Sequence, residues 1–261
     1  MADPAPTDPA AEAAGWERRL RDGGTVARAV SEKEYLKSDL EFAGTGVPAI
    51  RKMVAAWRKA RPSLSHDELI AMVQALWASP LYECRQAAVL LLERTTSLLG
   101  PADMPLIERL LRTSRTWALV DGLAVSVTGD LVERFGELGQ ALDRWAADDD
   151  FWLRRSALLA LLRPLRAGKG DFDRFARYAD AMIGEREFFI RKAIGWVLRE
   201  TAKRRPFLVA EWLGPRVHLA SGVTVREAVK PLPAPMRDAL MAGYRDKIPI
   251  RWEHLEQVLV G

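Results

Sequence analysis

The two residues best suited to chemistry are Trp117 and Asp121, which stand four positions apart in the sequence. On a helix, this spacing places both side chains on the same face. An indole ring attracts cations, and a carboxylate stabilises positive charge that develops during a reaction. The pair therefore suits a substrate that is cationic or becomes so. The alternative is a carboxylate that only pairs with a neighbouring arginine.

Other kinds of catalytic site find little support. The histidines His66, His218 and His254 lie far apart in no metal-ligand spacing, and no serine stands in a nucleophile elbow. The single cysteine, Cys84, falls inside an expected helix, which favours a small packed residue over a nucleophile. The acidic triplet at residues 148–150 fits a helix start, where carboxylates complement the positive end of the dipole. We therefore expect no bound metal and no cofactor.

The elements that would position these residues follow from a repeat. In each copy the first position is aromatic or otherwise apolar, and the fourth is usually arginine. The copies are spaced by 34, 35, 34, 37 and 35 residues and begin at Pro48, Tyr82, Trp117, Phe151, Phe188 and Val223. A period in the mid-thirties is typical of two short helices and their turns. The sequence therefore predicts an all-α fold, an α-solenoid of stacked helical hairpins.

The fourth and fifth positions of the repeats should lie on one edge of the second helix, and stacking would superimpose these edges. The column contains Arg51, Arg85, Arg154, Arg191 and Arg226, beside Lys52, Gln86, Asp121, Arg155, Lys192 and Glu227. Trp152 and Trp196, on adjacent repeats, would add indole faces to the same groove. The column predicts a concave basic groove. The alternative is that these arginines tie neighbouring repeats together, which the doubled pairs such as Arg154-Arg155 fit less well.

The charge distribution supports a polyanionic partner. Residues 148–206 hold 14 Arg or Lys against 9 Asp or Glu, a net charge of +5, whereas the whole chain carries +4. A basic excess on a few helices suggests nucleic acid, with a solvated basic face as the alternative. The hydrophobic fraction of 49% and the charged fraction of 28% suit a soluble globular chain with a continuous core.

The expected domain organisation is simple. Residues 1–15 should form a disordered tail, because interspersed prolines break any amphipathic face. Residues 16–261 should form a single solenoid domain, in which residues 230–261 cap the last repeat. Within it, Ser65 should cap a helix, and residues 117–135 should form one continuous helix.

The glycines Gly44 and Gly46 mark a turn. A phosphate-binding loop is the sharper alternative, but no lysine follows the second glycine and no strand pattern precedes the first. No apolar run of about eighteen residues is present to span a membrane, and residues 1–15 lack the basic start and apolar core of a secretory signal. The lone cysteine excludes an internal disulfide framework and fits a reducing cytoplasm.

Three segments carry the most specific patterns: residues 116–121 (TWALVD), residues 151–159 (FWLRRSALL) and residues 187–200 (EFFIRKAIGWVLRE). They resemble the DNA alkylation repair family of HEAT-like-repeat glycosylases, called AlkD, and the resemblance covers roughly residues 30–230. It implies excision of positively charged N3- and N7-alkylated purines from duplex DNA without a cofactor. The solenoid's concave face would follow the phosphate backbone. We expect a monomer in the cytoplasm, associated with the nucleoid.

The resemblance also implies roles for single residues. Asp121 would be the catalytic carboxylate, which stabilises the sugar cation and positions water. Trp117 and Trp196 would pack beside the deoxyribose of the lesion. Arg155 matches a phosphate-contacting arginine, and Tyr35 matches an aromatic residue near the lesion. The other candidates for DNA contact are Arg51, Lys52, Arg85, Trp152, Arg154, Arg191 and Lys192.

One departure from the family pattern keeps two other functions open. The family often carries two tryptophans and an extra acid ahead of the catalytic aspartate, whereas this chain has Thr116, Trp117 and Ala118. A non-catalytic HEAT-repeat binder of damaged or branched DNA is therefore an alternative. A second alternative is a protein scaffold whose arginines meet acidic peptides.

Overall fold

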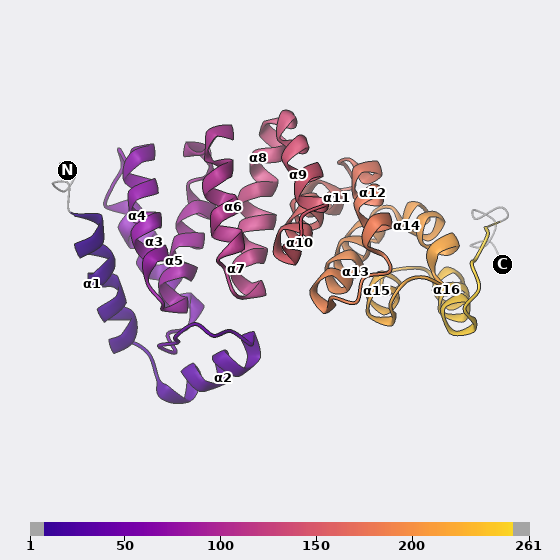
Figure 1. Cartoon of the computed structure of the whole chain (residues 1–261), viewed down its shortest axis with the longest axis horizontal. Coiled ribbons are helices and arrows are strands. Elements are labelled where there is room, and N and C mark those ends of the chain that lie inside the picture. The colour runs from indigo at the N-terminus through magenta and orange to yellow at the C-terminus, as the bar shows by residue number, and fades with distance from the viewer. Residues whose placement is uncertain (1–7, 253–261) are drawn as a thin grey trace. The chain divides into compact units, whose positions relative to one another are not determined.

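The computed structural model describes residues 8–252, which are helical apart from loops and one β-bridge between Glu41 and Leu81 (Figure 1). The predicted all-α class is confirmed. The contacts divide the chain into two compact units, Met1–Phe135 and Gly136–Gly261. The expectation of one solenoid domain over residues 16–261 stays a prediction. None of the helices between residues 8 and 252 is long and apolar enough to cross a membrane.

The first unit is a series of helical hairpins. Its α-helices are α1 (Pro9–Asp22), α2 (Val26–Leu36), α3 (Val47–Lys59), α4 (His66–Ala78), α5 (Tyr82–Arg94), α6 (Met104–Arg112), α7 (Trp117–Asp121) and α8 (Gly129–Arg134). Short 3-10 turns, Thr96–Leu98 and Pro101–Asp103, precede α6. The predicted cap at Ser65 is confirmed, because its hydroxyl accepts from the Glu68 amide while the Glu68 carboxylate accepts from the Ser65 amide.

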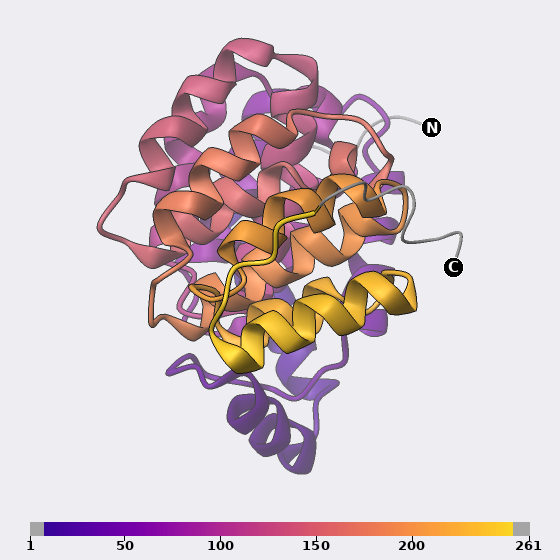
Figure 2. The ribbon, with the colours of Figure 1, turned by 90° about the vertical axis from the view of Figure 1, so that its right-hand side faces the viewer.

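The second unit continues the same pattern. Its α-helices are α9 (Gly139–Ala146), α10 (Phe151–Ala160), α11 (Leu162–Arg166), α12 (Phe172–Met182), α13 (Phe188–Ala202), α14 (Pro206–Leu213), α15 (Gly222–Ala228) and α16 (Ala234–Asp246). Two 3-10 turns, Gly136–Leu138 and Gly214–Arg216, precede α9 and follow α14. Figure 2 shows α16 at the end of this unit, and its contacts there are with α14 and α15.

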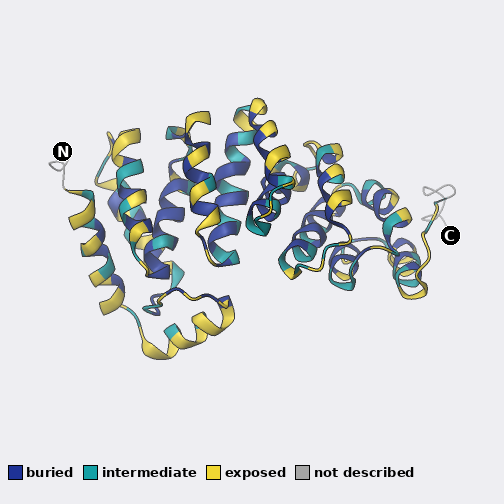
Figure 3. Cartoon of the chain, viewed as in Figure 1, coloured by how far each residue is buried: buried dark blue, intermediate teal, exposed yellow. Residues whose placement is uncertain are grey.

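The predicted repeat is confirmed by where the second helices begin. Five of the six second helices follow a first helix of the same hairpin, and these first helices are α4, α6, α9, α12 and α14. Each second helix starts within one residue of a predicted copy: α3 at Val47, α5 at Tyr82, α7 at Trp117, α10 at Phe151, α13 at Phe188 and α15 at Gly222. In Figure 3, the buried residues form the facing sides of the helices within each unit. Burying a leucine such as Leu91 contributes about 1.5–3 kcal/mol.

The expected disordered tail is wrong from Pro9 onward, because α1 begins there; residues 1–7 lie outside the described residues. Proline is tolerated in the first helical turn, where its missing N–H would have no helical partner. The side chain of Asp8 accepts from the Ala10 amide and caps the helix. One face of α1 is buried, with Trp16 only 1% exposed. The prolines therefore mark the start of a helix.

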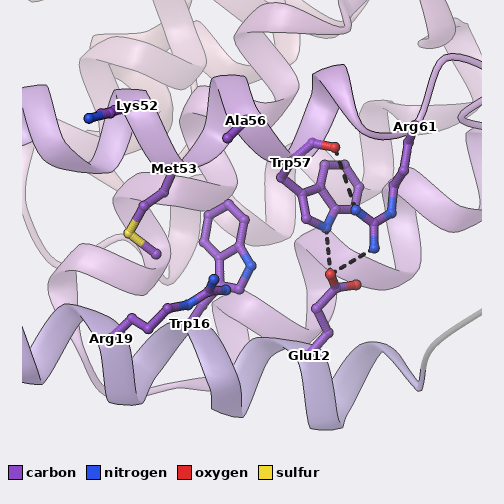
Figure 4. A pocket seen from close by; sticks show the side chains of 8 residues that line it. All are labelled: Glu12, Trp16, Arg19, Lys52, Met53, Ala56, Trp57 and Arg61. Atoms are coloured by element: carbon purple, nitrogen blue, oxygen red, sulfur yellow. Dashed lines mark hydrogen bonds and ion pairs between the residues drawn. The ribbon is translucent and has the colours of Figure 1, made fainter. Parts of the chain in front are cut away.

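A half-buried ion pair also holds α1 in the first unit. The Glu12 carboxylate accepts from the Trp57 indole N–H at 2.8 Å and from Arg61 Nη2 at 2.7 Å (Figure 4). These three side chains line a pocket of about 450 Å³ between α1 and α3. Because the Glu12 charge is paired with Arg61, this contact attaches α1 to α3 and leaves no uncompensated acid in the pocket.

Three repeat arginines close the turn that precedes their own helix. In each case the guanidinium group donates to a carbonyl six residues earlier: Arg85 to Ser79 at 3.0 Å, Arg154 to Asp148 at 2.6 Å and Arg191 to Glu185 at 2.6 Å. These carbonyls lie between the two helices of a hairpin, where no helical N–H reaches them. A partly buried carbonyl needs a donor, and the arginine supplies it.

A buried carboxylate fixes the loop between α2 and α3. Glu83 of α5 is fully buried, and it accepts from the amides of Ala43, Gly44 and Thr45 at 3.1, 2.6 and 3.2 Å. Gly44 has φ +80, a conformation that favours glycine, and a Cβ there would lie 2.2 Å from the Thr25 carbonyl. The expected turn is confirmed. Its amide groups bind the protein's own carboxylate, so they are not free to bind a phosphate.

The C-terminal cap is described only in part, because residues 253–261 lie outside the described residues. After α16 the chain turns back to α14. The Ile250 amide donates to the Gly214 carbonyl at 2.8 Å, and the Trp252 indole donates to the Ala210 carbonyl at 2.7 Å. The capping role of residues 230–261 stays a prediction.

We expect Glu83→Gln to lower the free energy of unfolding by about 1.5–3 kcal/mol, because hydrogen bonds to a charged group are lost and an amide N–H₂ faces backbone donors. Urea unfolding measures the change, and hydrogen exchange at residues 43–45 should become faster. Glu34→Gln, on the exposed face of α2, is the control and should change stability by about 0.5 kcal/mol or less. Equal stability of Glu83→Gln and wild type would contradict the anchoring role.

Candidate functional site

The first unit brings three predicted site residues together. Trp117 begins α7 and Asp121 ends it, so both side chains lie on one face of the helix. The ring of Tyr35 meets Trp117 edge to face, with centroids 5.6 Å apart and an interplanar angle of 81°. Tyr35 is 70% exposed, whereas Trp117 and Asp121 are half-buried. The result is a partly open surface with a carboxylate and two aromatic rings.

Two contacts hold α2 against the start of α7. The hydroxyl of Thr116 donates to the Leu36 carbonyl at 3.3 Å, and Arg115 pairs with Asp39 at 2.8 Å. Leu36 is the only residue of α2 that is buried, and Figure 1 shows this helix standing apart from the hairpins of its unit. The position of Tyr35 therefore depends on these contacts and on the loop bound by Glu83.

A π-helical segment, Gly122–Thr128, follows Asp121 directly. The expected continuous helix over residues 117–135 is therefore wrong in its middle, although the chain remains helical to Arg134. A π-helix widens the turn, and such segments often occur at functional sites. The hydroxyl of Thr128 donates to the carbonyl five residues earlier, that of Leu123, at 3.0 Å. The apolar and small residues at positions 122–128 show nothing in the sequence that distinguishes a π-helix from an α-helix.

Gly122 lets this segment pack closely on α5. A Cβ at Gly122 would lie 2.6 Å from Val89 Cγ1 and 3.0 Å from Glu93 Oε1. Glu93 thus lies beside the residue that follows Asp121. Burial raises the pKa of the Glu93 carboxyl, while a hydrogen bond with Ser126 and the charge of Arg51 act against this rise. The repeat pattern missed Glu93, because it lies outside the fourth and fifth positions.

The second unit provides protein partners for its predicted DNA-contacting arginines. Arg155 is 3% exposed, donates to the Phe189 carbonyl of the next repeat, and lies 5.9 Å from the Phe189 ring centroid. Arg154 pairs with Glu185 at 3.0 Å in addition to closing its turn. These contacts, like those of Arg85 and Arg191, agree with the interpretation of the column as structural ties. Direct DNA contact by these four arginines stays a prediction.

The remaining predicted residues are more accessible. Arg51 and Lys52 are exposed at the start of α3. Trp152 is partly exposed and packs with Phe189, their centroids 5.0 Å apart. On α13, Trp196 is half-buried, and Lys192, one turn before it, pairs with Glu227 at 2.8 Å. Their roles in binding DNA stay predictions.

Other catalytic groups are scarce in the part of the chain that the structure describes. Within residues 8–252, no group of three or more His, Cys, Asp or Glu could hold a metal ion. Cys84 is fully buried, and burial raises the pKa of its thiol to about 12, so it is a packed residue as expected. Asp150 caps α10 by accepting from the Trp152 amide, which confirms that the acidic triplet begins a helix.

We expect Gly122→Ala to lower the free energy of unfolding by about 1–3 kcal/mol, because the added methyl group overlaps Val89 in a packed contact. Chemical denaturation measures this cost. Gly100→Ala is the matched control: no atom lies within 4 Å of a Cβ there, and it should be neutral or slightly stabilising. A neutral Gly122→Ala would show that the π-helical segment is not tightly packed on α5.

We expect the stability of wild type relative to Glu93→Gln to fall as the pH rises above 4.5. The folded-state pKa of Glu93 is raised above its ordinary value of 4.5, so its contribution is fully present below that pH and is lost as the pH rises through the folded pKa. Thermal unfolding of both proteins from pH 4.5 to neutral pH tests this. A difference in stability that does not vary with pH would contradict the raised pKa of Glu93 in the folded protein.

Comparison with known protein families matches residues 16–232 to the family described as DNA alkylation repair enzyme. Among solved structures, the chain is similar to a predicted DNA alkylation repair enzyme from Enterococcus faecalis, with a TM-score of 0.73, 23% identity, and coverage of 81% of this chain and 97% of that chain. It is also similar to AlkD2 from Streptococcus mutans, with a TM-score of 0.54, 17% identity, and coverage of 80% and 100%. At these identities the likeness shows the fold, a helical-repeat solenoid. No curated protein matches the sequence.

Proposed function

This chain belongs to the DNA alkylation repair enzyme family and has a role in the repair of alkylated DNA, and on that premise we propose that it is a DNA glycosylase. Its substrates are cationic N3- and N7-alkylated purines in duplex DNA. The observation that carries the proposal is the half-buried carboxylate of Asp121 on the same face as Trp117, with Tyr35 packed against the indole.

The chemistry of the substrate explains why a carboxylate suffices. In an alkylated purine the base already carries a positive charge. When the C1′–N9 bond breaks, its electron pair moves to the base, which leaves as a neutral molecule without a proton from the enzyme. The deoxyribose then carries the positive charge as an oxocarbenium ion. Water adds to C1′ and loses a proton, which completes hydrolysis.

Asp121 stabilises the sugar cation in this scheme. A half-buried carboxylate interacts with a developing cation more strongly than one in bulk water, because the effective dielectric constant is lower. Trp117 contributes about 0.5–2 kcal/mol of cation–π attraction when a positive charge lies over its face. The edge-to-face contact with Tyr35 fixes the plane of the indole.

The remaining candidates have supporting roles in the proposal. Trp196 lies in the second unit. Its proposed contact with the deoxyribose rests on the family resemblance alone and not on the geometry around Asp121. The basic residues contact backbone phosphates, which position the duplex without reading its sequence. A monomer in the cytoplasm, associated with the nucleoid, would meet this substrate.

A second candidate function, non-catalytic binding of damaged DNA, is favoured by Ala118. This position lacks the extra acid that the family often carries before the aspartate. The two functions differ in one measurement: wild-type protein mixed with methylated duplex DNA either releases free 3-methyladenine and 7-methylguanine or only binds. Binding without release would replace the glycosylase proposal with the second function.

We expect Asp121→Asn to bind duplex DNA normally and to slow single-turnover base release by about 10²–10³-fold, because the amide keeps the shape but lacks the charge opposing the sugar cation. Asp22→Asn, at the exposed end of α1, is the control and should release bases at the wild-type rate. Unchanged release by Asp121→Asn, with circular dichroism confirming the fold, would remove Asp121 from the catalytic role.

A further inference from the structure

The second unit contains a buried carboxylate surrounded by cations. Glu227 of α15 has a side chain that is only 10% exposed. Its Oε1 atom accepts from Lys192 Nζ and from Lys230 Nζ, each at 2.8 Å, and its Oε2 atom accepts from Arg199 Nη1. Burial alone would raise the pKa of Glu227, but the hydrogen bonds from the two lysines and the nearby positive charges lower it to about 2.

The close approach of α13 and α15 makes this arrangement possible. A Cβ added at Gly195 of α13 would lie 2.9 Å from Glu227 Cβ and 3.1 Å from the Thr224 carbonyl. Because Gly195 has no side chain, Glu227 can reach the cations on α13. Arg199 and Lys192 come from α13, and Lys230 follows the end of α15. Residues distant in sequence thus converge on one carboxylate.

The charges in this cluster do not balance. Three cations share the single charge of Glu227, so the group carries a net charge of +2. A second buried acid, Glu200, does not compensate, because it pairs with Arg199 and also with Arg166 and Lys203. The Glu227 side chain lies inside, while those of Lys192, Arg199 and Lys230 remain 41%, 28% and 56% exposed. The excess positive charge therefore faces solvent.

A phosphate group suits this arrangement. Lys192 and Lys230 share one acceptor atom, so their ammonium groups lie within two hydrogen-bond lengths of each other. A tetrahedral anion with several acceptor oxygens can accept from such closely spaced donors at once. Because Glu227 already fixes the long cationic side chains, less side-chain entropy is lost when an anion binds.

The position of the cluster favours DNA as the source of the phosphate. On α13, Lys192 and Arg199 lie one turn before and one turn after Trp196, on the same helix face. We propose that Lys192, Arg199 and Lys230, held in place by Glu227, form a binding site for one backbone phosphate of duplex DNA. This rests on the proposed function in alkylated-DNA repair. It adds Arg199 and Lys230, which the repeat pattern did not single out, and it makes Glu227 a positioning residue.

The test is the salt dependence of binding to an unmodified duplex. The logarithm of the association constant falls with the logarithm of salt concentration with a slope of about 0.9 for each phosphate neutralised. A site for one phosphate predicts that the double variant Arg199→Gln/Lys230→Gln reduces this slope by about 0.9. Two independent contacts would reduce it by about 1.8, and a cluster that never meets DNA would leave it unchanged. Either of these results would overturn the proposal.

Two further variants keep the test decisive. Lys230→Glu changes one exposed side chain and should fold even if the double variant does not; it should weaken binding more than tenfold at low salt, and wild-type affinity would refute the site. Arg216→Gln is the matched control, because it removes a cation from an ion pair with Asp180 in the same unit, and its slope should equal that of wild type.

The outcomes separate this proposal from the glycosylase proposal. Unmodified duplex has no base to excise, so a protein that releases no methylated base can still show the predicted change in slope. Conversely, base release with an unchanged slope would refute only the phosphate site. Inorganic phosphate is added at constant ionic strength as a competitor. Displacement of the duplex at millimolar concentrations would indicate a site for free phosphate and would overturn the assignment to DNA.

Discussion

Each turn between two helices leaves carbonyl groups that no helical N–H can reach, and the repeat depends on the way in which these groups are satisfied. Arg85, Arg154 and Arg191 each donate to a carbonyl six residues earlier. An arginine can serve the turn and a neighbour together, because its guanidinium group has five N–H donors. Arg85, for example, also donates to the Thr113 carbonyl at 2.8 Å. In these three repeats, the arginine that marks the copy in the sequence thus satisfies a carbonyl of its own turn.

Carboxylates have the complementary role, because they accept hydrogen bonds from neighbouring segments and so fix them. Buried Glu83 binds three loop amides, and half-buried Glu12 attaches α1 to α3. Buried Glu227 accepts from Lys192 and Arg199 of α13 and from Lys230, which follows α15. A buried charge is costly unless it is paired and hydrogen-bonded, and each of these acids is. The loop that Glu83 holds leads from α2, so the place of Tyr35 beside Trp117 depends on a carboxylate from another repeat.

The arginines and the carboxylate proposed for catalysis occupy different places in the repeat. The arginines at turns and between repeats donate to carbonyls of the protein. Asp121 ends a short helix, precedes a π-helical segment, and lies half-buried on the same face as Trp117, whose ring meets Tyr35. Gly122 allows this irregular segment to pack against Val89 and Glu93. The carboxylate proposed for catalysis therefore stands where the regular repeat is interrupted.

The sequence by itself determined the helical class and the start of every second helix, because a period in the mid-thirties and an apolar first position depend only on local spacing and on burial that every repeat shares. It also placed Trp117 and Asp121 on one face. The tertiary structure decided which partner each charged side chain meets. An arginine looks the same in the sequence whether it binds a carbonyl six residues back, a carboxylate in the next repeat or a ligand. It also decided the helix at Pro9, the π-helical segment after Asp121 and the cluster at Glu227, since each depends on contacts between segments distant in sequence.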